Sequence, residues 1–291
     1  MDISDEYVNN ISSISGKESV INMDYSYLNK FFTRKALFDA VLSVNFDSNT
    51  YLNDVERNYQ VLSESYRNEF FFKNVLFNKL VLGKYSLNTS AAFSEMVINN
   101  SKADFVLINH SNGTVFEIKT DLDNLDRLIY QINDYYTVFS EVYVVTSEKN
   151  YYPVYRLLKE VCPNVGIIVL NKRKYLSVRK KAIMDDSLLN YESIFKLLRK
   201  KEYETILLNQ FKFLPETKPV YHFRACLTQF KKLDIGTAQK STFQQLNNRN
   251  KMLDYGMLKK LPDSLRWLIY SGNFSIQQIN EILIKLDREG G

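Results

Sequence analysis

The chain has 291 residues, of which 45% are hydrophobic and 24% charged. These values are typical of a soluble globular protein and exclude a largely disordered chain. The net charge of +5 permits an anionic partner such as nucleic acid, although an ordinary Lys-rich surface explains it equally simply. The two cysteines and two histidines are too dispersed for a zinc site. A polar, acidic N-terminus and the lack of long apolar runs predict a cytoplasmic protein without a signal peptide or membrane span.

Helices are expected before the first strand. Residues 1–50 form a predicted N-terminal helical segment, in which Thr33 caps a helix over 33–44. A second helix is predicted from Asp54 to Leu82, because apolar residues recur there every three or four positions. Gly83 is the expected end of that helix.

The pattern then changes to short β-rich segments. Three successive strands are predicted over 92–98, 104–109 and 114–120, with the tight turn "NHSNG" between the last two. The following elements are a helix over 121–139 capped by Asp121 or Asp123, a strand over 141–146, a helix over 151–161 and a strand over 164–170. This order predicts an α/β domain over 51–184 with a mixed sheet covered by helices, followed by an all-helical C-terminal domain over 185–291.

Charged residues stand within the predicted hairpin. Glu117 and Lys119 are two residues apart, so a strand projects both to one side, and Asp104 begins the neighbouring antiparallel strand. Two converging carboxylates favour a divalent cation, and oxygen ligands suit Mg²⁺ or Mn²⁺. A lysine beside them can stabilise developing charge on a phosphate. The alternative is an edge hairpin whose polar residues simply face solvent.

These residues carry a family resemblance. Ala103–Asp104 followed by Glu117–Lys119 resembles the signature of the PD-(D/E)XK nuclease superfamily, with Ala103 in place of the namesake proline. Gln131 and Tyr135 resemble the QxxxY motif of RecB-type nucleases. A closer similarity, over roughly residues 65 to 270, is to an uncharacterised bacterial family of this superfamily. The resemblance implies a restriction-endonuclease-like αβββαβ core and DNA as the favoured substrate.

Two further acids are candidates for a third carboxylate. Glu69 lies on the helix before the first strand, where many superfamily members carry an extra acid, and Glu95 lies within the first strand. We favour Glu95, because a mid-strand glutamate otherwise needs an explanation. The predicted metal ligands are therefore Asp104, Glu117 and Glu95. Solvent-facing positions are the alternative for both Glu69 and Glu95.

A basic segment follows the last predicted strand. It contains Lys172, Arg173, Lys174, Arg179, Lys180 and Lys181 without an intervening acid. One interpretation is a nucleic-acid-binding stripe that contacts phosphates. The other is a solvated edge strand, since lysines also protect sheet edges.

The sequence thus predicts a Mg²⁺- or Mn²⁺-dependent nuclease. Its catalytic residues would be Asp104, Glu117, Lys119, Gln131, Tyr135, Glu95 and Glu69. The alternative is a catalytically silent protein of the same fold that binds nucleic acid or a protein partner in a phage, mobile-element or defence context. The C-terminal helices would then hold a protein partner or a second copy of the chain.

Overall fold

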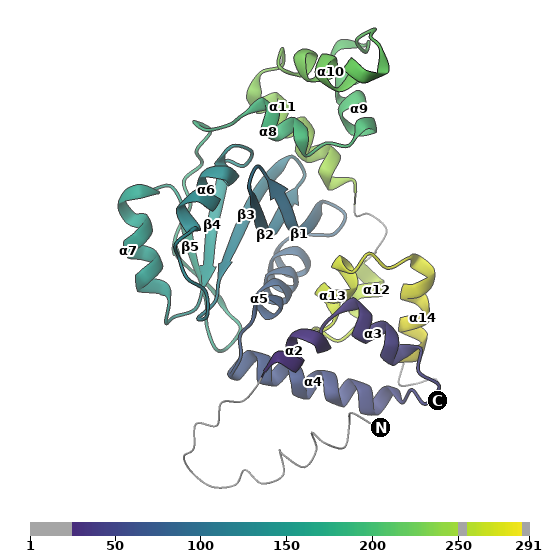
Figure 1. Ribbon diagram of the computed structural model, residues 1–291. Helices are drawn as coiled ribbons and strands as arrows, with labels where there is room; N and C mark the ends of the chain where they lie inside the picture. Colours follow the sequence, from purple (N-terminus) through teal and green to yellow (C-terminus); the bar gives the residue numbers. More distant parts are fainter. Residues whose placement is uncertain (1–24, 250–254, 287–291) are drawn as a thin grey trace.

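The computed structural model describes residues 25–249 and 255–286. A six-stranded mixed sheet lies at the centre, and helices cover both of its faces (Figure 1). The predicted α/β class with a mixed, helix-covered sheet is therefore confirmed.

The strands follow one another across the sheet in chain order. They are β1 (Ser90–Ile98), β2 (Ser101–Asn109), β3 (Asn112–Lys119), β4 (Glu141–Thr146), β5 (Gly166–Leu170) and β6 (Leu176–Lys180). Strands β1 to β3 are antiparallel, β3 to β5 are parallel, and β6 is antiparallel to β5. The five predicted strands are all present, and the basic segment contributes the edge strand β6 that was one of its two interpretations.

The turn of the β2–β3 hairpin does not include the Asn112–Gly113 pair of the predicted turn "NHSNG". Asn109 pairs with Asn112, so His110 and Ser111 form the turn, with His110 at a φ of 53°. Gly113 lies in β3, where a Cβ atom would come within 2.7 Å of the Phe139 ring. The glycine is therefore required by packing against aromatic rings and not by the turn.

The helices that precede the sheet are α2 (Ser26–Phe31), α3 (Arg34–Val41), α4 (Ser48–Glu64), α5 (Glu69–Leu76) and the π-helix η1 (Phe77–Lys84). The predicted cap at Thr33 is confirmed, since its side chain accepts from the Ala36 N–H. The single helix predicted over 54–82 is wrong. The helical conformation is interrupted between α4, which ends at Glu64, and α5, which begins at Glu69. Asn68 caps α5 by accepting from the Phe71 N–H at 3.0 Å.

The predicted helix after β3 begins later than expected. Helix α6 spans Leu128–Tyr136. Asp123 instead accepts from the Thr120 N–H, and Asp121 accepts from the Ser147 hydroxyl, so neither residue caps the helix. Helix α7 (Tyr151–Val161) confirms the helix predicted over 151–161, and Pro153 lies in its first turn.

The helices after β6 divide between the two faces. They are α8 (Tyr191–Lys196), α9 (Lys200–Phe211), η2 (Pro219–Tyr221), α10 (His222–Phe230), α11 (Ile235–Asn247), α12 (Tyr255–Lys259), α13 (Arg266–Ser271) and α14 (Ile276–Leu286). Helices α8 to α11 share a core with α6 and α7, where Phe139 stacks on Phe243 at 5.0 Å.

Helices α12 to α14 pack with α2 to α5 on the opposite face (Figure 1). There Phe105 of β2 lies 5.2 Å from the Trp267 ring, and Lys285 of α14 donates to the Val41 carbonyl at 2.6 Å. The described part of the chain thus begins and ends on this face.

Candidate functional site

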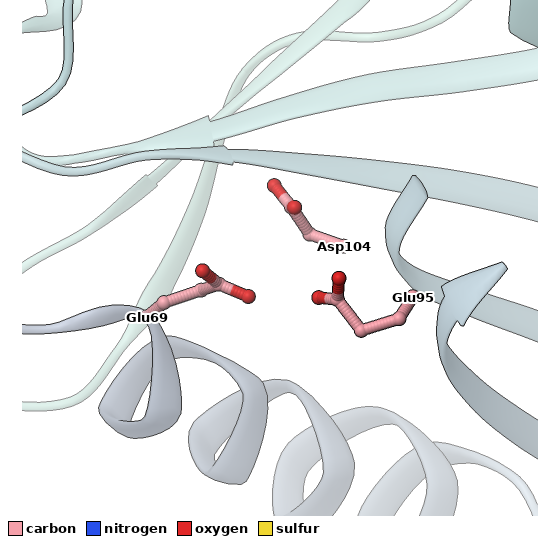
Figure 2. A group of neighbouring side chains, drawn as sticks. All are labelled: Glu69, Glu95 and Asp104. Carbon is pink, nitrogen blue, oxygen red and sulfur yellow. The ribbon is translucent and has the colours of Figure 1, made fainter. Parts of the chain in front are cut away.

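Three acids from three elements meet at the side of the sheet that faces α5. Glu69 comes from the first turn of α5, Glu95 from β1 and Asp104 from β2, and their carboxylates point toward one another (Figure 2). Each offers an oxygen within 4.8 Å of the others. We call these residues the acidic triad. Its all-oxygen composition suits a hard divalent cation such as Mg²⁺ or Mn²⁺.

Backbone structure explains how the acidic triad forms. The break before α5 places Glu69 at the helix start, where a carboxylate is favoured by the helix dipole. Glu95 has a φ of 55°, an uncommon conformation for a non-glycine residue in mid-strand. Its neighbours Ser94 and Met96 pair with residues on either side of Asp104, so Glu95 and Asp104 lie opposite each other. Strain of on the order of 1 kcal/mol or more at such a residue is typical of functional sites.

Asp104 has the most perturbed acidity of the triad. Burial, together with the nearby charges of Glu117 and Glu69, raises the pKa of Asp104 to about 8. One of its oxygens accepts from the Ile118 N–H at 2.7 Å, which fixes the side chain against β3. A divalent cation would replace the proton that this carboxyl otherwise retains.

Lys73 is a component of this region that sequence reasoning missed. This buried lysine forms ion pairs with Glu69 and with Glu95, the latter at 2.8 Å. Burial opposes its charge, but the two glutamates outweigh that effect and raise the pKa of Lys73. The available signal was a lysine four residues after Glu69 in an otherwise apolar helix.

A second set of polar side chains lies on the other side of β3, against α6. Glu117 is 1% exposed and accepts from Lys119 at 2.9 Å, while the Tyr135 hydroxyl lies 2.6 Å from its other oxygen. Lys119 also donates to Gln131 at 3.0 Å. We call these four residues the buried network. Burial raises the pKa of Glu117 despite the opposing effect of Lys119 and Tyr135.

The structure therefore arranges the predicted ligands differently from the sequence interpretation. Asp104 and Glu95 come together as expected, but Glu69 completes the triad. The Glu117 oxygens are engaged by Lys119 and Tyr135. Glu117 is near enough to raise the pKa of Asp104, so the two sets adjoin through that pair.

One member of the acidic triad, Glu69, lines an open cleft of about 390 Å³. Glu69 and Lys73 line it, together with Asn29 and Arg34 from the N-terminal helices and Ser94 from β1. The cleft gives a ligand a route from solvent to this face of the sheet.

The predicted basic stripe is dispersed. Lys174 lies over the Tyr59 ring at 4.7 Å, Arg179 pairs with Glu148 at 2.8 Å, and Lys180 donates to the Pro163 carbonyl at 2.5 Å. Lys172, Arg173 and Lys181 are exposed. The segment thus offers separated cations and not a continuous row of phosphate contacts.

A known protein family matches most of the chain. The model of the bacteriophage P4 protein cII family matches residues 63–265. The chain belongs to this family. No curated protein and no solved structure matches it. The matched segment of this cII-family protein contains both the acidic triad and the buried network, and the family description supports the predicted phage or mobile-element context.

Among the helices of residues 25–249 and 255–286, none combines the length and the apolar character that a membrane crossing requires.

Proposed function

We propose that this cII-family protein is a Mg²⁺- or Mn²⁺-dependent nuclease that hydrolyses phosphodiester bonds in DNA. The observation that carries the proposal is the acidic triad, with oxygens within 4.8 Å of one another. The buried network that holds Lys119 adjoins the triad at Asp104 and Glu117. Hard cations bound by carboxylates are the usual catalysts of phosphodiester hydrolysis. A cytoplasmic location is part of the proposal.

The acidic triad would hold the cation. A bound divalent cation polarises the phosphate and lowers the pKa of an attacking water. Asp104, which its raised pKa of about 8 leaves largely protonated at neutral pH, would hold the cation as a carboxylate and lose its proton on binding. Glu69 and Glu95 supply the remaining protein oxygens, and the adjoining cleft admits the substrate strand.

Lys119 would act on the phosphate. Its ammonium is restrained by Glu117 at 2.9 Å and by Gln131 at 3.0 Å, so its direction is fixed before substrate arrives. A preorganised cation stabilises the negative charge that develops on the phosphate in the transition state. Glu117, Gln131 and Tyr135 are in this mechanism positioning residues for Lys119.

DNA is preferred over RNA on the resemblance of the Asp104, Glu117–Lys119 and Gln131–Tyr135 motifs to RecB-type nucleases. The phage character of the family agrees with a DNA substrate.

The decisive experiment is a cleavage assay on DNA and RNA, with Mg²⁺, Mn²⁺ or EDTA. Asp104→Asn should lose cleavage while remaining folded by circular dichroism. Lys119→Met should also lose cleavage, but with lower stability, because it leaves the buried Glu117 without its partner. Asp39→Asn is the matched control, because Asp39 is an exposed acid that pairs only along its own helix with Lys35. The proposal fails if the wild-type protein cuts neither nucleic acid, or if the site variants cut as well as the control.

One observation favours a second candidate function. Lys73 already neutralises part of the negative charge of the acidic triad without a metal ion, since it pairs with Glu69 and Glu95. The second candidate is therefore a silent nuclease-like protein that binds nucleic acid or a protein partner, for which the helices after residue 185 offer a surface. Calorimetry that detects no Mg²⁺ or Mn²⁺ binding, together with DNA binding without cleavage, would support it.

A further inference from the structure

A second cleft lies at the carboxyl ends of the three parallel strands. It measures about 480 Å³, and its walls include Asp121 after β3, Glu148 and Lys149 after β4, and Lys172 and Arg173 after β5. Ligands commonly bind at this end of parallel strands in α/β proteins. We call it the basic cleft. The proposed catalytic mechanism does not use it.

The charges that line the basic cleft favour an anion. Four basic side chains, Arg67, Lys149, Lys172 and Arg173, outnumber the two acids, Asp121 and Glu148. Glu148 is already paired with Arg179 at 2.8 Å, outside the lining. The uncompensated charge is therefore positive.

Arg67 forms the fixed wall of the basic cleft. Its guanidinium donates to the Leu170 and Asn171 carbonyls and lies 5.2 Å from the Phe72 ring centre, so its orientation is set. Its buried Nε has no hydrogen-bond partner among the described residues. A planar guanidinium held in this way places a fixed positive charge at the cleft wall, where it attracts a phosphate oxygen.

The basic cleft adjoins the acidic triad and the buried network along the chain. Arg67 precedes Glu69 by two residues, and Asp121 follows Lys119 by two residues. Two residues of extended chain span at most about 7 Å. The backbone positions of Arg67 and Glu69, and those of Lys119 and Asp121, therefore lie within about 7 Å of each other, so a nucleic-acid strand has a short path from the triad to this cleft.

We propose that the basic cleft binds a phosphate group of the substrate strand, next to the phosphate that is cut. This inference rests on the proposed nuclease function for its substrate class, and it assigns Arg67, Lys149, Lys172 and Arg173 to strand positioning. The phosphate is either internal or at a strand end, and both share the same oxygen chemistry.

The test uses the exposed pair on the loop after β5. The double variant Lys172→Ala/Arg173→Ala removes two positive charges without touching the packed Arg67. The matched control is Lys200→Ala/Lys201→Ala, which removes two adjacent exposed charges from α9. Binding of labelled single-stranded oligonucleotides is measured by fluorescence anisotropy in EDTA, so the readout needs neither metal nor cleavage.

The cleft variant should bind the oligonucleotide about tenfold more weakly than wild type and the control. Its plot of log affinity against log salt should be shallower by about 0.7, as expected for one lost phosphate contact on a single strand. Inorganic phosphate should compete with the oligonucleotide in wild type and lose that effect in the variant.

Strand ends identify which phosphate is bound. Oligonucleotides with a 5′-phosphate, a 3′-phosphate or only hydroxyl ends are compared. If one terminal phosphate improves binding to wild type but not to the variant, the ligand is that end. An equal loss for all three substrates identifies an internal phosphate.

The inference is overturned if the cleft variant binds like wild type, if the control loses as much affinity, or if wild type binds no oligonucleotide. An absence of cleavage with the expected binding losses would overturn the nuclease function alone. If cleavage occurs, the cleft variant should raise KM and leave kcat unchanged, as a positioning role requires.

Discussion

The acidic triad and the buried network adjoin at Asp104 and Glu117, yet they differ in their access to solvent. The Glu69 and Glu95 side chains are 49% and 47% exposed, whereas Glu117 and Lys119 are 1% and 11% exposed. Ligand exchange requires access, and a fixed ammonium requires enclosure. The acidic triad therefore suits a replaceable cation, while the buried network suits a permanent internal charge pair.

The acidic triad and the buried network also differ in their contribution to stability, because they differ in exposure to water. Partly exposed ion pairs contribute little, because water screens them. A buried pair adds little net stability when intact, but loss of one partner leaves a costly unpaired charge. Substitutions in the triad should therefore change chemistry, and substitutions in the buried network should also change folding.

The largest expected effect is on cleavage. Asp104→Asn should lower kcat about 1,000-fold, because a neutral amide binds the cation poorly and about 4 kcal/mol of transition-state stabilisation is lost. Steady-state cleavage at saturating Mn²⁺ measures it, with Asp39→Asn as the control. A variant that retains more than a tenth of the activity would place the cation elsewhere.

The next largest effect separates the two sets by stability. Glu117→Ala should lower the free energy of unfolding by about 3–5 kcal/mol, because Lys119 is left buried without its carboxylate. Glu95→Ala should cost about 1 kcal/mol or less. Urea denaturation in EDTA compares them, and equal losses would contradict the distinction between exposed and buried sets.

The third effect is a pH dependence of stability. The pKa of Asp104 is about 8 in the folded protein and about 4 in an unfolded chain. Between these two pKa values the folded protein keeps a proton on Asp104 that the unfolded chain has released. This proton binding stabilises the folded state, and the stabilisation is lost as pH rises toward 8. The slope is at most about 1.4 kcal/mol per pH unit.

Asp104→Asn should remove that slope, which denaturation in EDTA at about pH 6, 7 and 8 would measure. Mg²⁺ affinity should change in the opposite direction and rise with pH up to about 8, since the cation displaces the proton. An unchanged slope in the variant would show that another group titrates.

The smallest effect concerns Lys73. Lys73→Met should bind Mg²⁺ about threefold to tenfold more tightly, because the ammonium no longer competes for Glu69 and Glu95. Titration calorimetry compares it with Lys35→Met, which removes an exposed lysine paired with Asp39. Weaker Mg²⁺ binding in Lys73→Met would instead make the lysine a support for the ligands.

Strands were predictable from sequence where the pattern of apolar residues within the segment itself determines the structure. The run over 141–146 gave the bounds of β4 because a strand covered on both faces is continuously apolar. The break at Asn68 was missed because the apolar spacing continues through it. The Asn-Gly pair was misassigned to the turn because the rings that require Gly113 come from distant residues, Phe139 and Phe243.

The candidate site was predictable in part. Spacing alone placed Glu117 and Lys119 on one side of β3, where they now hydrogen bond at 2.9 Å. Glu69 and Glu95 were both named as candidates for a third carboxylate. That both join Asp104 could not be inferred, since it depends on the break before α5 and on the unusual backbone of Glu95. Lys73 was missed because a lysine four residues after a glutamate is ordinary on an exposed helix.

The Lys285–Val41 hydrogen bond joins the last described helix to one of the first. The wall of the triad's cleft likewise combines Asn29 with Trp267 and Ser271. During translation, this wall cannot form until the ribosome has released α13. A chain that stopped before α13 would carry the three acids but lack that wall of the cleft.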